Sequence, residues 1–369
     1  MNIAFVLLTH NPDEPAGIER SIASLAEGLR EAGHHPLIIA AGPATPADHA
    51  GLLRLSTLTL PRPAREEDLL ALLADPAPVV REVRHLLTAH RAELVCWADA
   101  VWGLGYLSPA PPGVATALMV HVPRADEAMH QSLAHGPRAV LTTGDFMIRE
   151  MAGADLDTSS WHAVPNALLH LAAPPHPSER EKLRRGGAVR IVARAEPHKG
   201  IAELLAALPT EFGRRVQIVL AEAGFEYWPG MQNETIARCR KLAAGLPEVE
   251  LRRALPWQQV QPFLAGAAAT LIGSTSPETF GNVAAEALSV GTPVVGYGLG
   301  HLPALVGTAG RMVALDDGPE QIWQTLADLL DDREEYHASA QQGPAQVADL
   351  APHAVAAAFL AAAAPRETS

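Results

Sequence analysis

The stretch Ser274-Thr-Ser-Pro-Glu278-Thr-Phe-Gly281-Asn-Val-Ala-Ala-Glu286-Ala-Leu-Ser-Val-Gly291-Thr-Pro293 decides the fold of the second half of the chain. An apolar run at 269–272 ends just before it and predicts a buried strand, residues 281–289 have helical spacing, and 292–296 form a second apolar run. The order strand, loop, helix, strand is typical of a parallel sheet with helices on both faces. We therefore expect Glu278 to lie in a loop at the carboxyl end of a strand.

The same alternation extends outward through the chain. In the first half, strands are expected at 2–8, 36–40, 94–97, 115–120, 139–142 and 161–164, with a helix at 18–29 that Gly33 ends. In the second half, strands are expected at 189–193, 216–220, 249–251, 269–272 and 292–296, with a helix near 202–208. This pattern predicts two doubly wound, Rossmann-like α/β domains that face a central cleft, where ligands bind beyond the strand ends.

The domain boundaries follow from the same pattern. We expect an N-terminal domain over 1–172 and a linker over 173–187, where prolines and a basic cluster occur. A C-terminal domain follows over 188–350, and the alanine-rich segment 351–369 is expected to be a final helix that packs on the body and is stopped by Pro365.

Composition excludes several classes of partner. The 369 residues carry a net charge of -13, with a pI near 5.6, which disfavours nucleic acid and anionic membrane surfaces. No apolar run is long enough to predict a membrane span, and the N-terminal apolar run lacks the basic flank of a signal peptide. Cys96 and Cys239 show no metal or redox spacing. We therefore expect a cytoplasmic protein, and its scarcity of lysine relative to arginine suggests a bacterial source.

Glu278 and Glu286 are the first candidate site residues. One lies in the loop and the other about two turns further along the chain, so the two carboxylates are suited to different parts of one extended ligand. The spacing, with Pro-Glu, Phe-Gly and Gly-Thr-Pro-Val around it, closely resembles the Glu-x7-Glu signature of retaining GT-B glycosyltransferases, especially family 4. The alternative, a loop carboxylate and a helix-surface glutamate, does not account for the accompanying residues.

That resemblance implies roles for the residues of this loop and helix. Glu278 would be catalytic and would hold hydroxyls of the donor sugar, and Glu286 would bind the ribose of the nucleotide. Phe280, Gly281 and Asn282 would offer backbone amides to the donor sugar. A nucleotide-diphosphate sugar is then the co-substrate, and no cofactor is expected.

A second match follows the strand that begins the C-terminal domain. Ala193-Arg194-Ala-Glu-Pro-His-Lys199-Gly200 resembles the family's G-R-L-x-x-x-K-G, although Ala193 replaces its first glycine. A leaving diphosphate develops negative charge that arginine and lysine neutralise without a metal. The resemblance implies that Arg194 and Lys199 bind the donor diphosphate; the alternative is a solvated basic turn.

The N-terminal half carries weaker matches. Gly17, in Ala16-Gly17-Ile-Glu-Arg, resembles the family's G-G-x-E-R and would let backbone approach the donor diphosphate, although the same residues fit a plain loop-to-helix transition. His121 follows an expected strand where the family often has a histidine that reaches the donor sugar, so the resemblance implies that His121 is catalytic, although a histidine there is as often structural. Asn166, in an interrupted match to V-P-N-G-V-D, is expected to be a turn residue.

Two further features were weighed. Asp155-Leu-Asp157 matches the D-x-D metal motif of the GT-A fold by three residues alone, so we expect no metal. Tyr227 and Trp228 lie where the family usually has a short glycine-rich loop. They are expected either to stack on an acceptor or base or to anchor the loop in the core, and we favour the anchor.

The expected function is a retaining, metal-independent glycosyltransferase acting on a soluble small-molecule acceptor. A secondary-metabolite aglycone or an aminocyclitol is the first expectation, and a sugar or sugar phosphate, as in a disaccharide synthase, is the second. A phosphorylase of the same fold and a non-catalytic sugar-nucleotide-binding subunit remain alternatives. Possible acceptor contacts are His10, Trp97, Asp99, Trp102 and Arg124; the sequence does not predict the oligomeric state.

Overall fold

The computed structural model describes residues 1–11, 16–45, 48–49 and 51–364. The chain forms two compact units. Unit 1 contains Met1–Leu168 and Leu350–Ser369, and unit 2 contains Leu169–Asp349. Each has one parallel sheet with helices, so the predicted fold class of two doubly wound α/β domains is confirmed.

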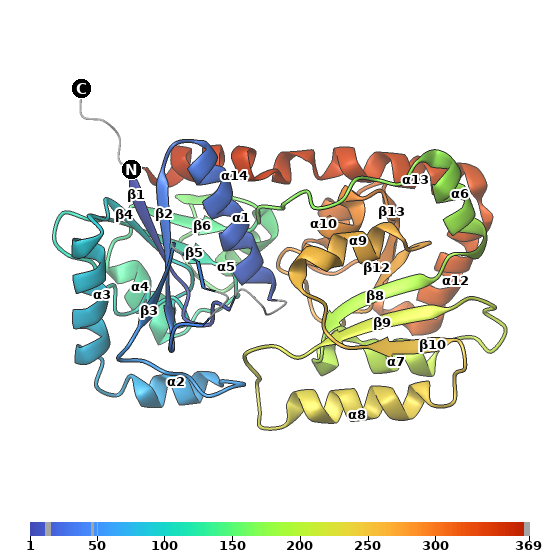
Figure 1. The fold of residues 1–369 in the computed structure, drawn as a ribbon, viewed down its shortest axis with the longest axis horizontal. Helices are drawn as coiled ribbons and strands as arrows, with labels where there is room; N and C mark the ends of the chain where they lie inside the picture. The colour runs from blue at the N-terminus through green and yellow to red at the C-terminus, as the bar shows by residue number, and fades with distance from the viewer. Residues whose placement is uncertain (12–15, 46–47, 50, 365–369) are drawn as a thin grey trace. The chain divides into compact units, whose positions relative to one another are not determined.

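Unit 1 has a seven-stranded parallel sheet in the order β3-β2-β1-β4-β5-β6-β7 (Figure 1). Its strands are β1 (Asn2–Val6), β2 (His35–Ala41), β3 (Leu52–Leu55), β4 (Leu94–Trp97), β5 (Ala115–Val120), β6 (Ala139–Thr142) and β7 (Trp161–Ala163). Its helices are α1 (Gly17–Glu31), α2 (Glu66–Leu72), α3 (Ala77–Ala89), α4 (Glu127–Ala134), α5 (Asp145–Gly153) and α14 (Pro352–Ala363). Order along the chain reverses between β1 and β4, so the carboxyl ends of these two neighbours form a topological switch point.

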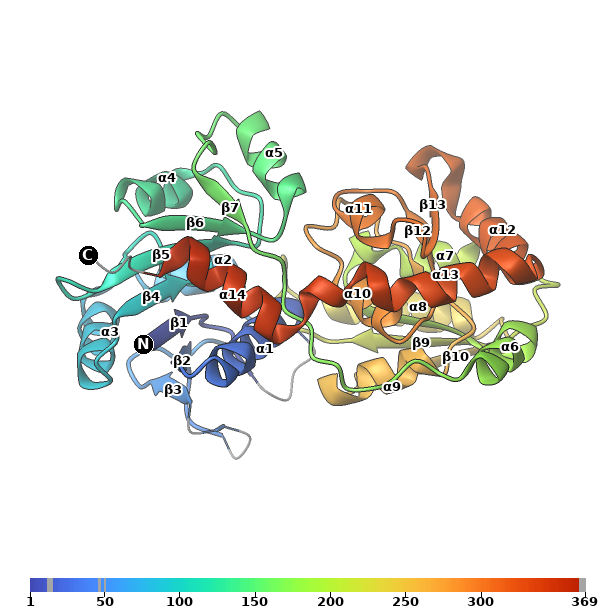
Figure 2. The same ribbon diagram turned by 90° about the horizontal axis from the view of Figure 1, so that it is seen from above.

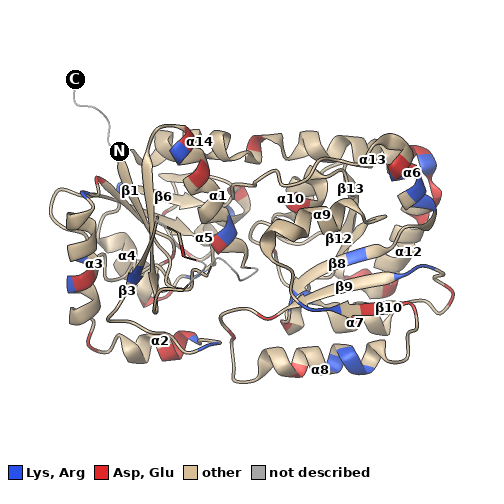
Figure 3. Ribbon diagram, viewed as in Figure 1, with Lys and Arg blue, Asp and Glu red and all other residues tan. Residues whose placement is uncertain are grey.

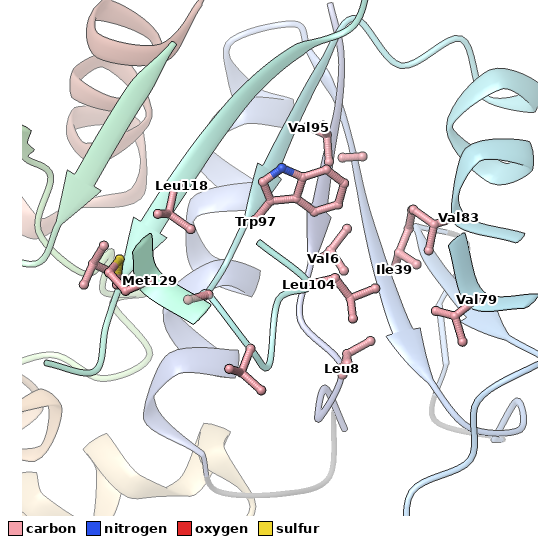
Figure 4. Packing of buried hydrophobic residues seen from close by; sticks show 14 of the residues in the cluster. Val6, Leu8, Ile39, Val79, Val83, Val95, Trp97, Leu104, Leu118 and Met129 are labelled. Carbon is pink, nitrogen blue, oxygen red and sulfur yellow. The ribbon is translucent and has the colours of Figure 1, made fainter. Parts of the chain in front are cut away.

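Side chains of β4 alternate between the two faces of this sheet because successive strand residues point in opposite directions. Val95 and Trp97 pack with α3 and α4, as Figure 4 shows. Leu94 and Cys96 pack with α1 and α14 instead. Both faces of the sheet are therefore buried, which explains why the strands are continuous apolar runs.

Helices α1 and α14 lie side by side although they come from opposite ends of the chain (Figures 1 and 2). Gly28 makes this approach possible, because a Cβ at this position would lie 2.1 Å from the carbonyl oxygen of Pro352. Phe359 of α14 then contacts Phe5 of β1 with ring centroids 5.4 Å apart. The expected final helix thus packs on unit 1, while Pro365 lies outside the described residues.

Unit 2 has a six-stranded parallel sheet in the order β10-β9-β8-β11-β12-β13. Its strands are β8 (Val189–Arg194), β9 (Val216–Ala221), β10 (Val249–Arg252), β11 (Thr270–Ile272), β12 (Val294–Tyr297) and β13 (Gly310–Val313). Its α-helices are α6 (Pro177–Gly186), α7 (Ile201–Ala206), α8 (Met231–Ala243), α9 (Val260–Ala265), α10 (Asn282–Ser289), α11 (Leu302–Val306), α12 (Gly318–Asp331) and α13 (Arg333–Gln346). Short 3₁₀ turns are η1 (Pro197–Lys199), η2 (Trp257–Gln259) and η3 (Leu315–Asp317), and η4 (Ala348–Leu350) follows α13.

The prediction of a linker over 173–187 is corrected by the structure, because residues 177–186 form helix α6. Pro177 occupies the first turn, where its missing N–H is not needed, and His176 Nδ1 accepts a hydrogen bond from the Ser178 amide. Prolines and a basic cluster had predicted the linker, and Figure 3 shows that α6 carries charges of both signs. Arg180 is instead 3% exposed and donates to the carbonyl oxygens of Ala267 at 2.7 Å and Val290 at 2.9 Å.

Residues 333–363 are long and apolar enough, by length and composition alone, to cross a membrane. In the structure this stretch consists of α13, η4 and α14, and α13 contains an internal proline, Pro344. Val355, Ala356 and Phe359 of α14 are buried in the core of unit 1. The apolar character of α14 is therefore explained by packing on the sheet.

Candidate functional site

The candidate site of unit 2 lies at the carboxyl ends of β8 and β11. These strands are neighbours in the sheet but not in the chain. The strand order reverses between them, so their carboxyl ends form a topological switch point. The turn after β8 contains Arg194 and Lys199, and the loop after β11 contains Glu278. The two best sequence matches are thus brought to one edge of one sheet.

Two glycines allow these loops to meet. Gly200 has φ +67°, and a Cβ there would lie 2.0 Å from the carbonyl oxygen of Gly273. A Cβ on Gly273 would in turn lie 2.7 Å from Leu204 Cδ1. The amide of Thr275 also donates to the carbonyl oxygen of His198 at 2.8 Å. Any side chain at position 200 would therefore push the two loops apart.

Lys199 and Glu278 form the centre of the site. Lys199 Nζ lies 2.6 Å from Glu278 Oε1, and the hydroxyl of Ser274 donates to the same oxygen. Both charged side chains are 17% exposed. Burial disfavours the charged carboxylate, but the charge of Lys199 and the hydrogen bonds from Lys199 and Ser274 hold the pKa of Glu278 below its ordinary value. Glu278 is therefore a fixed anion at neutral pH.

The backbone of the Glu278 loop is anchored on the loop after β12. The His301 amide donates to the Glu278 carbonyl oxygen at 2.8 Å, and Glu278 forms a parallel bridge with Gly300. A Cβ at Gly300 would lie 2.3 Å from that carbonyl oxygen, so glycine is required there too. Phe280 is 3% exposed and stacks on the His301 ring at 5.5 Å with an interplanar angle of 15°. The Phe280 ring thus helps to fix the Glu278 loop, a role that the sequence motif around Phe280 did not indicate.

Helix α10 begins directly after this loop. Gly281 precedes it with φ +97°, and a Cβ there would lie 2.7 Å from Leu302 Cδ2. Asn282 is the first residue of the helix, so the amides around it belong to the first turn, which lacks intrahelical partners. Glu286 lies one turn further along α10 and is 6% exposed. The sequence-predicted sugar and ribose residues thus share one loop and one helix.

Arg194 is the last residue of β8. Its Nη2 lies 3.1 Å from Oε2 of Glu196, and its guanidinium lies over the ring of Phe225, 4.9 Å from the centroid. Glu196 is 1% exposed and also lies 3.2 Å from His198 Nε2. Glu196 was not predicted from the sequence, because the motif specifies the two cations and leaves position 196 open. A carboxylate between Arg194 and Lys199 is the signal that could have indicated it.

Unit 1 holds the remaining sequence-predicted residues. Gly17 is the first residue of α1, and Pro15 of its motif lies outside the described residues. His121 follows β5 directly and is 3% exposed, and in the structure neither ring nitrogen has a hydrogen-bond partner. Burial lowers the pKa of His121 to about 4, so its imidazole is neutral at pH 7.

Asp99 and His10 lie at the switch point between β1 and β4. Asp99 Oδ1 accepts from the amides of Val101 at 2.8 Å and Trp102 at 2.9 Å, while its Oδ2 is buried without a hydrogen-bond partner in the structure. Burial raises the pKa of Asp99 above its ordinary value. His10 is 1% exposed, and neither of its ring nitrogens has a hydrogen-bond partner among the residues that the structure describes. Burial, with the Arg54 charge, lowers the pKa of His10 to about 4.

Two other acceptor candidates have structural roles. Trp97 is 2% exposed in the core of unit 1 (Figure 4), so it is not available to a ligand. Arg124 lies 2.8 Å from Glu66 Oε1, makes a closer contact with Asp126 and lies 3.8 Å from Asp99 Oδ1. Its charge is therefore compensated within the protein.

The preferred interpretation of the loop after β9 is wrong. Tyr227 is 59% exposed and Trp228 is 45% exposed, so neither anchors the loop in the core. Gln232, which is 5% exposed, is the anchor instead, because its side chain donates to the carbonyl oxygens of Ala223 and Phe225. The same sequence pattern fits an exposed and a buried aromatic ring, so the sequence does not distinguish the two.

Among the described residues, no group of three or more His, Cys, Asp or Glu side chains is placed to hold a metal ion. Asp157 of the D-x-D match accepts hydrogen bonds from the amide and hydroxyl of Ser159. This carboxylate has a local role in the turn after α5.

Comparisons with known proteins find a matching family model and a related sequence. Residues 188–332 match the family model described as Glycosyl transferases group 1. The chain is 30% identical over 174 residues to a D-inositol 3-phosphate glycosyltransferase of Segniliparus rotundus. That match covers 47% of this chain and 38% of the relative, so the chain spans well under half of the relative's length.

Solved structures resemble nearly the whole chain. Sucrose-phosphate synthase of Thermosynechococcus elongatus has a TM-score of 0.77 at 19% identity and covers 97% of this chain and 96% of its own. Anabaena Alr3699/HepE, solved in complex with UDP-glucose, has a TM-score of 0.75 at 17% identity, covering 97% of both chains. AviGT4, a glycosyltransferase involved in avilamycin A biosynthesis, has a TM-score of 0.60 at 21% identity, covering 99% of both chains. The two units thus have the GT-B fold, and residues 188–332 match the model of the group 1 glycosyl transferases.

Proposed function

We propose that this protein is a retaining glycosyltransferase that transfers a sugar from a nucleotide-diphosphate sugar to a soluble small-molecule acceptor. The observation that carries the proposal is the partly buried cluster of Lys199, Glu278 and Ser274 at the switch point of unit 2. The group 1 family match over residues 188–332 and the GT-B fold support the same reaction class.

The donor would bind across the β8 turn and α10. Arg194 and Lys199 supply two positive charges for the diphosphate, and the first turn of α10 supplies amides and a positive dipole end. Glu278 accepts hydrogen bonds from hydroxyls of the donor sugar, while Glu286 binds the ribose. Because Lys199 contacts Glu278 directly, the diphosphate and sugar contacts are held in one rigid geometry.

In the transfer step, the bond between the anomeric carbon and the diphosphate oxygen breaks, and the acceptor oxygen forms the new glycosidic bond. The negative charge that develops on the leaving diphosphate is stabilised by Arg194 and Lys199, so the reaction is proposed to need no metal. The proton of the acceptor hydroxyl passes to the leaving diphosphate. Family resemblance implies that the anomeric configuration is retained.

For the acceptor, the chemistry of unit 1 favours a hydroxyl-bearing molecule that carries no phosphate. Asp99 Oδ2, His10 and His121 are buried polar groups without hydrogen-bond partners in the structure, and such groups gain from hydroxyl partners. Arg54 lies 2.7 Å from Asp48, and Arg124 is also paired with carboxylates, so neither offers an uncompensated charge to a phosphate. An aglycone or aminocyclitol acceptor, and a cytoplasmic location, fit this proposal.

The proposal is tested by thermal shifts of the purified protein with UDP, GDP, ADP, dTDP and CDP, each with and without magnesium. A ligand that binds the folded state raises the melting temperature. We expect one nucleotide to give a clear shift that magnesium does not change. Absence of a shift with all five nucleotides would remove the basis for a nucleotide-sugar donor.

A further inference from the structure

The loop between β9 and α8, residues 222–230, presents aromatic rings beside the turn that holds Arg194 and Lys199. It follows β9, which is the neighbour of β8 in the sheet, so the two carboxyl ends lie together (Figure 1). Tyr227 exposes 59% of its surface. An exposed tyrosine at the edge of a ligand site offers a flat apolar ring and a polar hydroxyl, which suit it to contact with a ligand.

This loop has a defined shape. Gln232 of α8 holds it from inside: its Oε1 accepts from the Ala223 amide at 2.5 Å, and its Nε2 donates to the Ala223 carbonyl oxygen at 3.1 Å and the Phe225 carbonyl oxygen at 3.2 Å. Glu226 is 8% exposed and accepts from the Gly230 amide at 3.1 Å. Buried polar side chains thus fix the backbone, and Tyr227 is presented from a preorganised loop.

A chain of ring contacts joins the loop to the diphosphate turn. The guanidinium of Arg194 lies over the Phe225 ring at 4.9 Å. The edge of one ring meets the face of the other between Phe225 and Tyr227, at 5.7 Å and 89°. Tyr227 also contacts the His198 ring at 6.0 Å. Tyr227 therefore contacts the turn that ends at Lys199 through His198, and Phe225 lies between Tyr227 and Arg194.

We propose that Tyr227 stacks on the heterocyclic base of the donor nucleotide and that Phe225 is a positioning residue for Arg194. This inference rests on the proposed function. The base is the planar ring that is covalently tied to the diphosphate, and Tyr227 belongs to the same unit as the diphosphate turn. The acceptor groups Asp99, His10 and His121 belong to the other unit. Phe225 contributes by holding the guanidinium of Arg194 through a cation–π contact.

The test is isothermal titration of the full chain with the five nucleoside diphosphates and with inorganic pyrophosphate. Removal of one stacking ring weakens base binding on the order of tenfold. Tyr227→Ala is therefore expected to weaken the preferred nucleotide by about tenfold while leaving pyrophosphate affinity unchanged. Tyr227→Phe keeps the ring and should bind like the parent protein. Leu315→Ala, at a residue 38% exposed in η3 of the same unit, is the matched surface control.

Phe225→Leu separates the second part of the proposal. It keeps an apolar side chain but loses the face on which Arg194 rests, so both pyrophosphate and nucleotide affinities should fall. Equal nucleotide affinity in Tyr227→Ala and the parent protein would overturn the stacking assignment. So would an equal loss for pyrophosphate and nucleotide in Tyr227→Ala, because the ring would then act on the turn. If the parent protein binds pyrophosphate more tightly than it binds any of the five nucleotides, the proposed function fails as well.

Discussion

At the scale of single residues, Lys199 and Glu278 are 79 positions apart in the chain, yet they form one partly buried ion pair. Its two charges are each compensated, which lowers the cost of burying them. A substrate diphosphate near Lys199 would find a cation whose position is already fixed by Glu278 and by the η1 turn. The pair is therefore expected to act as a unit.

Lys199→Ala and Glu278→Gln should each lower the transfer rate on the order of 10²-fold or more, because each removes a preorganised contact to the transition state. The double variant should lose little more than either single one, since coupled residues are not additive. Rates of nucleotide release measure the transfer rates of the single and double variants, and circular dichroism spectra show whether each variant is folded. Near-normal rates in both folded single variants would show that the chemistry lies elsewhere.

The buried histidines of unit 1 make its stability depend on pH. The pKa of His121 falls from 6.5 to about 4 in the folded chain because burial disfavours the imidazolium. The unfolded chain therefore takes up the proton first, so this stability is full above pH 6.5 and is lost as the pH falls toward 4. The loss amounts to about 3 kcal/mol for such a shift.

Urea unfolding at several pH values checks this expectation. His121→Gln cannot take up the proton, so its free energy of unfolding should fall less than that of the parent protein between pH 6.5 and pH 4. Parallel pH profiles for the two proteins would mean that His121 is protonated equally in the folded and unfolded chains.

At the scale of elements, close backbone contacts fix where helices and loops meet. Gly28→Ala should destabilise unit 1 by about 1–3 kcal/mol, because the new Cβ would overlap the Pro352 carbonyl oxygen at the α1–α14 contact. Gly153→Ala, at the open end of α5, is the control, since no atom lies within 4 Å of its Cβ position. Melting temperatures measure the difference, and equal values for the two variants would argue against a tight α1–α14 contact.

Gly200→Ala tests the approach of the two site loops. Its Cβ would overlap the Gly273 carbonyl oxygen, so the variant should lose nucleotide binding as Lys199 moves away from Glu278. Gly213→Ala shares the positive φ, at +68°, but its nearest neighbouring atom lies 3.8 Å away. It therefore reproduces the backbone strain without the overlap. Nucleotide titration should separate the two variants; equal affinities would leave the steric argument without support.

The elements predicted from sequence were those with unbroken apolar runs. The expected strand at 94–97 coincides with β4, and the expected helix at 18–29 lies within α1, with Gly33 at φ +82° just after it. β3 and β13 were missed because each has just four residues, with an arginine inside the strand. β10 is equally short, but its arginine is the last residue, and it was predicted at 249–251. Helix α6 was missed because its anchoring residue, Arg180, is charged, and burial of an arginine depends on distant carbonyl groups.

At the scale of the whole molecule, the sequence predicted two doubly wound units, and the structure has them. Motif spacing also located the carboxylate and the cation that meet at the unit 2 switch point. It did not predict Glu196, the Phe280–His301 stack or the exposure of Tyr227, since each depends on which loops become neighbours in the sheet. The group 1 match covers residues 188–332, all of which lie in unit 2.

A crystal structure with the best-binding nucleoside diphosphate would show whether the switch point between β8 and β11 holds the donor nucleotide, as we propose. We expect phosphate oxygens within hydrogen-bond distance of Arg194 and Lys199, and ribose hydroxyls at Glu286. A nucleotide bound in unit 2 away from Arg194 and Lys199, or bound to unit 1 alone, would contradict the account.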